Sequence, residues 1–107
     1  MEVRLHPLAR SELARAPMGE RRAIANAIDK LAVSGAQLAY SHSSAVQGAS
    51  GLRELRPRAG RSPWRAFYRR AGEMLVVAAI GPEAQADPRG FRRAVEDALA
   101  RLTESSD

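Results

Sequence analysis

The stretch WRAFYRRAGEMLVVAAI, residues 64–80, predicts two β-strands joined by a short turn. Its second half, residues 74–80, is uninterrupted apolar sequence, which is typical of a central strand covered on both faces. Along the first half, residues 64–70, side chains alternate between the two faces of the strand. One face then carries Trp64, Ala66 and Tyr68, and the other carries Arg65, Phe67 and Arg69.

A third strand precedes this hairpin. Residues 52–56, LRELR, are followed by the turn-like segment PRAGRSP, so the three strands form an antiparallel meander. The small, polar residues 36–50 have no clear periodicity, and we expect them to form a connecting loop.

Helices flank the meander on both sides in the sequence. After a short edge strand at residues 2–6, residues 8–16 and 18–35 predict a helical hairpin that turns at Pro17. Asp87 and Pro88 are typical of a helix start, and an apolar stripe then runs to the C-terminus. The expected fold is a single α+β domain, residues 1–107, with the helical hairpin and the C-terminal helix packed on one face of an antiparallel sheet.

Positive charge is concentrated in one part of the chain. Residues 51–70 hold seven arginines and one acid, Glu54, whereas the rest of the chain is close to neutral and the whole chain has a formal charge of +5. Such a patch favours phosphate binding, since guanidinium groups bind phosphate with two hydrogen bonds and stay charged. The alternative is a solvated basic surface, or arginines that pair with acids such as Glu54, Glu73 and Glu83.

Composition excludes several other kinds of site. The chain has no cysteine and only two histidines, which excludes disulfides, a thiolate zinc site, a cysteine nucleophile and a histidine-rich metal cluster. We expect no metal and no cofactor. Without a long apolar run or a signal-peptide pattern, the sequence predicts a cytoplasmic protein that does not span a membrane.

The order of these elements resembles the RelE/ParE superfamily of type II toxins, and its HigB-like, phage-derived branch most closely. The resemblance lies in Gly51, the Glu54-Leu55-Arg56 strand, the Arg65-x-x-Tyr68 strand, the apolar strand and the proline-started last helix. It covers residues 36–103 well and the helical hairpin loosely. Many relatives carry a lysine-rich segment after the apolar strand, whereas this chain has GPEAQADP, residues 81–88, at that place.

The resemblance implies a toxin that acts with a HigA-like helix-turn-helix antitoxin. Such toxins enter the ribosome and cleave mRNA, so the expected function is a metal-independent endoribonuclease that inhibits translation. Two alternatives stay open: a ParE-like toxin that inhibits DNA gyrase, and a basic RNA-binding or protein-binding module without catalysis. The sequence leaves open the codon preference, the dependence on ribosomes and the oligomeric state.

Cleavage of RNA without a metal requires alignment of the 2′-oxygen, stabilisation of charge on the phosphorus centre and proton transfer. We predict a catalytic group of Arg56, Arg65, Tyr68 and Arg69, and a set of RNA-binding residues that comprises Arg53, Arg58, Arg61 and His42. The proton acceptor is left open between Tyr68, His42, Glu54 and Glu83. Because strand positions are rigid, we expect alanine at Arg56 or Arg65 to abolish cleavage in a protein that still folds, and alanine at Arg58 or Arg61 to weaken binding.

Overall fold

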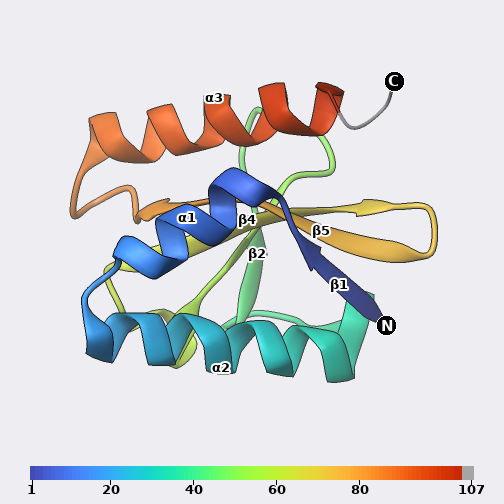
Figure 1. Cartoon of the computed structure of the whole chain (residues 1–107), viewed down its shortest axis with the longest axis horizontal. Helices are drawn as coiled ribbons and strands as arrows, with labels where there is room; N and C mark the ends of the chain where they lie inside the picture. Colours follow the sequence, from blue (N-terminus) through green and yellow to red (C-terminus); the bar gives the residue numbers. More distant parts are fainter. Residues whose placement is uncertain (105–107) are drawn as a thin grey trace.

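The computed structural model describes residues 1–104, and these form three helices and a five-stranded sheet (Figure 1). In chain order the elements are β1 (Glu2–Leu5), α1 (Pro7–Arg15), α2 (Met18–Ser34), the 3-10 turn η1 (Gly35–Gln37), β2 (Ser43–Ala45), β3 (Arg53–Leu55), the 3-10 segment η2 (Pro57–Gly60), β4 (Trp64–Ala71), β5 (Met74–Pro82) and α3 (Pro88–Glu104). The α+β class and the order of the predicted elements are confirmed.

The sheet is mixed, which corrects the prediction of an antiparallel sheet. Its strand order is β1-β5-β4-β3-β2, and every pair is antiparallel except β1 and β5, which run parallel with Glu2 opposite Met74. The apolar strand β5 therefore has neighbours on both sides, as its composition predicts. The segment 36–50 also differs from the expected loop, because Ser43–Ala45 forms the edge strand β2 beside β3.

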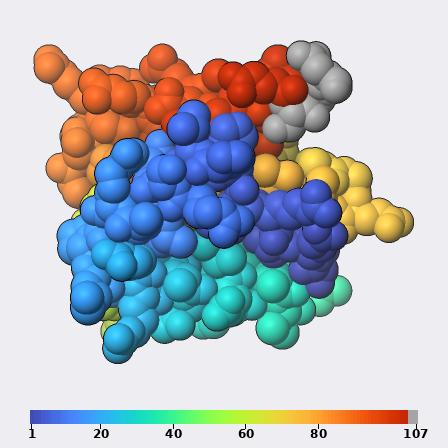
Figure 2. All heavy atoms as spheres, viewed as in Figure 1, coloured from blue at the N-terminus to red at the C-terminus, as the bar shows by residue number. Residues whose placement is uncertain are grey.

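Helices cover both faces of the sheet, which corrects the prediction that they share one face. Figure 1 shows α2 below the sheet and α3 above it. The apolar core on the α1 and α2 side includes Ile24, Leu31 and Tyr68, and the core on the α3 side includes Phe67 and Leu102. The reason lies in β5, whose side chains are apolar on both faces, so that each face requires a helical layer. In the space-filling view, α1, α2 and β1 form one continuous face with α3 above it (Figure 2).

The pairing of β4 with β5 contains one irregularity. Phe67 lies opposite Ala79 and Tyr68 lies opposite Val77, so Ala78 has no partner in the register. The predicted faces of β4 are nevertheless confirmed, since Ala66 and Tyr68 pack toward α1 and α2 while Phe67 packs toward α3.

An ion pair completes the edge of β5 beyond the end of β1. The last backbone bond on this edge runs from His6 N to Val77 O, at 2.9 Å. Farther along, Ile80 N donates to Glu12 Oε1 at 3.0 Å, and Arg101 Nη1 donates to Ala78 O at 2.9 Å. Arg101 also donates to both Glu12 carboxylate oxygens, at 3.0 and 2.9 Å. This hydrogen bond to Glu12 is the main cause that raises the pKa of Arg101 above its usual value.

Glu12→Ala should therefore lower the free energy of unfolding by about 3 kcal/mol, because it leaves the charge of Arg101 and the Ile80 amide without their shared acceptor. Urea denaturation measures the change. The control is Asp29→Ala on the exposed side of α2, for which we expect less than about 0.5 kcal/mol. Equal effects of the two substitutions would contradict the proposed importance of this ion pair.

None of the helices within residues 1–104 is long and apolar enough to cross a membrane.

Candidate nucleic-acid interface

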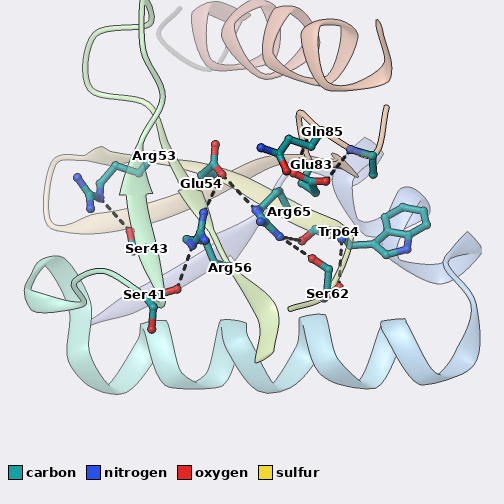
Figure 3. A network of polar contacts seen from close by, with 11 residues as sticks. Ser41, Ser43, Arg53, Glu54, Arg56, Ser62, Trp64, Arg65, Glu83 and Gln85 are labelled. Atoms are coloured by element: carbon teal, nitrogen blue, oxygen red, sulfur yellow. Dashed lines mark hydrogen bonds and ion pairs between the residues drawn. The ribbon is translucent and has the colours of Figure 1, made fainter. Parts of the chain in front are cut away.

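A polar cleft of about 450 Å³ lies where β3, β4 and the end of β5 meet. Its lining residues are Glu54, Arg56, Gly60, Arg61, Ser62, Pro63, Arg65, Glu83, Ala84 and Gln85. Strand register brings the central pair together: Glu54 lies opposite Phe67, and Arg65 is two residues before Phe67 on the same face. Figure 3 shows Glu54, Arg56 and Arg65 directed toward one another.

Arg65 is almost completely buried at the base of this cleft, with 3% of the residue exposed. Its Nε lies 3.1 Å from Glu54 Oε1, and its Nη1 donates to Ser62 O at 2.7 Å and to Trp64 O at 2.9 Å. This arginine of the predicted catalytic group is thus turned inward and anchored by three acceptors. The two backbone carbonyls explain how a charged group is accommodated on a covered strand.

Arg56 lies on the other side of the same carboxylate. Its Nη1 is 3.6 Å from Glu54 Oε1, its Nε donates to Ser41 O at 3.0 Å, and its guanidinium carbon lies 4.9 Å from the centre of the Tyr40 ring. Glu54 therefore contacts two arginines. Some arginines of residues 51–70 are thus paired with an acid, as the alternative interpretation of the basic segment predicts.

Each of these guanidiniums keeps one amino group for a ligand. Within residues 1–104, Nη2 of Arg56 and Nη2 of Arg65 have no acceptor, and neither is sealed from solvent, since no buried side-chain nitrogen lacks a partner. Glu54 Oε2 is likewise without a partner in this part of the chain. The cluster thus presents two anchored cations and one free carboxylate oxygen.

Glu83 shapes the segment GPEAQADP, residues 81–88. Its two carboxylate oxygens accept the backbone amides of Gln85, at 3.0 Å, and Ala86, at 2.6 Å, while its own amide donates to Pro63 O. Asp87 then accepts the Gly90 amide at 3.0 Å, in keeping with its predicted position at the start of α3. The acids of this segment are thus used to fold the turn between β5 and α3.

The remaining arginines of residues 51–70 differ in their pairing. Arg58 lies 3.1 Å from Glu20 on α2, so its charge is partly neutralised. Within residues 1–104, four arginines have no carboxylate at ion-pair distance: Arg53, Arg61, Arg69 and Arg70. An excess of positive charge therefore survives, as the sequence predicts.

The structure does not bring all predicted site residues together. Tyr68 lies on the opposite face of the sheet, 2% exposed, with its hydroxyl 2.5 Å from Ser43 Oγ. Arg53 donates to the same Ser43 hydroxyl at 3.0 Å. Tyr68 and Arg53 line a separate hollow together with Arg69. His42 and Arg58 lie in a third place, a groove beside α2. Of the predicted catalytic group, only Arg56 and Arg65 share the cleft.

Some residues that line the cleft and the groove beside α2 were not among the predicted site residues. Ser62 and Gln85 of the cleft and Arg22, Asn26 and Lys30 of the α2 groove were not predicted as binding residues. The last three could have been found from their spacing of four residues, which places them on one stripe of a helix.

Residues 11–81 match the family described as phage derived protein Gp49-like. Among solved structures, a mutant of the E. coli toxin RelE in the free state is similar, with a TM-score of 0.62 over 89% of this chain and 94% of that chain at 14% sequence identity. A search of curated proteins finds no match. The family match confirms the predicted phage-derived branch, and the similarity to RelE confirms the predicted fold. The chain therefore belongs to the phage-derived Gp49-like family.

Proposed function

We propose that this chain is the toxin of a type II toxin-antitoxin system that cleaves mRNA on the ribosome without a metal ion. The observation that supports the proposal is the cluster in the polar cleft, where Glu54 holds Arg56 and Arg65 and each arginine keeps a free amino group. Arg61, at the rim of the same cleft, is exposed and has no acid partner within residues 1–104. A phosphodiester in the cleft would meet three cations.

The arginines are assigned to charge stabilisation. As the 2′-oxygen attacks phosphorus, negative charge grows on the nonbridging oxygens, and donors fixed beforehand by the fold stabilise it without reorganisation. Arg65 is held by three acceptors and Arg56 by two, so their free Nη2 groups are well placed for this purpose.

Glu54 is assigned to proton transfer. Among the four open candidates, Tyr68 lies on the other face, His42 lies in another groove, and both oxygens of Glu83 are bonded to backbone amides. Within residues 1–104, Glu54 Oε2 has no partner, and the same carboxylate contacts both arginines through Oε1. It would take the proton of the 2′-hydroxyl as the 2′-oxygen bonds to phosphorus. The bond from phosphorus to the 5′-oxygen breaks, and that oxygen takes a proton from solvent. The products are a 2′,3′-cyclic phosphate and a 5′-hydroxyl.

Expression of this chain alone in a bacterial host tests the proposal. We expect translation to fall within minutes, together with the appearance of mRNA fragments with 5′-hydroxyl ends, and we expect a co-expressed HigA-like helix-turn-helix antitoxin to prevent both. Gel analysis of mRNA and of plasmid supercoiling on the same samples separates the alternatives. Intact mRNA with relaxed plasmid would favour inhibition of gyrase, and no change in either would favour a binding module without catalysis.

A further inference from the structure

A second concave surface lies on the α2 side of the sheet, between α2 and the β3–η2 segment. This α2 groove has a volume of about 340 Å³. Its lining residues are Gly19, Arg22, Ala23, Asn26, Ala27, Lys30, Leu38, His42, Leu55, Arg56, Arg58, Ala59 and Arg61. Five of them are cationic and none is a carboxylate. Arg58 is paired with Glu20, and the other four cations make the groove complementary to an anion.

One wall of the groove is a polar stripe on α2. Arg22, Asn26 and Lys30 are four residues apart along the helix and all are exposed. At 1.5 Å per residue, the stripe from Arg22 to Lys30 is about 12 Å long. Within residues 1–104 neither Arg22 nor Lys30 has an ion-pair partner. These two charges are therefore available to a ligand that lies along the stripe.

The groove adjoins the cleft. Arg56 and Arg61 line both surfaces, at the point where the chain turns from β3 into η2. A phosphate chain bound at the Glu54–Arg65 cluster can therefore extend past these two arginines toward α2 while it stays in contact with cations. The apolar lining of the groove consists of Ala23, Ala27 and the buried Leu38 and Leu55.

We infer that the α2 groove binds single-stranded RNA next to the phosphodiester in the cleft. The inference rests on the proposed function and names the path of its substrate. Ribose and base would pack on the apolar lining, and the phosphates would meet the two basic walls. An acidic partner helix fits less well, because helix-in-groove binding needs pockets for large apolar anchors, and this lining consists of alanines and leucines.

Two neighbouring arginines on α2 allow a charge-matched test. Arg22 lines the groove, whereas Arg21 lies outside it and donates from Nη2 to Ala16 O at 3.4 Å. Arg22→Glu and Arg21→Glu change the net charge by the same amount on adjacent residues. The probe is a fluorescent hexanucleotide with 2′-O-methyl riboses, which cannot be cleaved because the 2′-oxygen is blocked. Binding is measured by fluorescence anisotropy at low and at physiological salt, with circular dichroism as the folding control.

Arg22→Glu should weaken binding by about tenfold or more and reduce the salt dependence, while Arg21→Glu should weaken it by about twofold. Lys30→Glu, two turns farther along the same stripe, should match Arg22→Glu. Equal weakening by Arg21→Glu and Arg22→Glu would overturn the inference, since total charge would then explain binding. It would also be overturned if a glutamate-rich helical peptide distinguished the two variants and the hexanucleotide did not.

Cleavage of unmodified RNA by the parent protein is measured separately. If the protein does not cleave RNA but the two variants differ in hexanucleotide binding, the proposed catalysis is contradicted and RNA binding in the α2 groove is supported. If the protein cleaves RNA and the two variants bind the hexanucleotide equally, only the inference that the α2 groove binds RNA is contradicted.

Discussion

Glu54→Gln is expected to slow RNA cleavage by about 10²–10⁴-fold, the range of a lost general base. Glutamine keeps the shape of the side chain and can still accept a hydrogen bond from Arg65 through its amide oxygen. It cannot take a proton from the 2′-hydroxyl at neutral pH, and it no longer holds the two guanidiniums by charge. Single-turnover cleavage of a defined RNA, on ribosomes, measures the loss.

Glu83→Gln is the matched control, because Glu83 is the other carboxylate of the cleft. Both of its oxygens accept backbone amides, and one amide oxygen of glutamine can keep one of these bonds. We expect cleavage to change by a few-fold at most, as estimated for a side chain that only supports a turn. A large loss in Glu83→Gln with normal cleavage in Glu54→Gln would reverse the assignment of the proton acceptor.

Arg65→Ala is expected to lower the free energy of unfolding by about 3–5 kcal/mol, the typical effect of removing one partner of a buried ion pair. The substitution leaves Glu54, whose side chain is only 14% exposed, without its nearest cation, and it deprives two backbone carbonyls of their donor. Because small domains are stable by only about 5–15 kcal/mol, this loss is a large share of the total and should lower the melting temperature markedly. Thermal and urea denaturation measure the change.

The structure thereby changes the expectation that alanine at Arg65 leaves a folded but inactive protein. The control is Arg70→Ala on the same strand, an exposed residue whose side chain donates to Gly72 O. It should alter stability by less than about 0.5 kcal/mol. Arg65→Lys should fall between the two, since an ammonium group keeps the charge but lacks the planar fork that reaches three acceptors. If Arg65→Ala were as stable as Arg70→Ala, the anchoring described here would be wrong.

Local patterns in the sequence were sufficient to predict most of the helices and strands of this protein. The apolar run at 74–80 predicts the central strand, the alternation at 64–70 predicts which side chains of β4 share a face, and Asp87-Pro88 predicts the start of α3. These features depend on residues that are neighbours along the chain, and their periods of 2.0 and 3.6 can be read directly. Residues 43–45 carry no such period, which is why β2 was predicted as a loop.

Contacts between distant residues were decided only by the tertiary structure. The sequence by itself determined an α+β chain with excess arginine at residues 51–70 and the ordered elements of its family. In the fold, the predicted site residues are separated. Glu54 pairs with Arg65, Tyr68 lies on the other face of the sheet, and Arg56 lines a groove together with a polar stripe of α2. Strand register, the side on which each helix packs and the parallel pairing of β1 depend on long-range packing of the whole domain, and no local pattern carries that information.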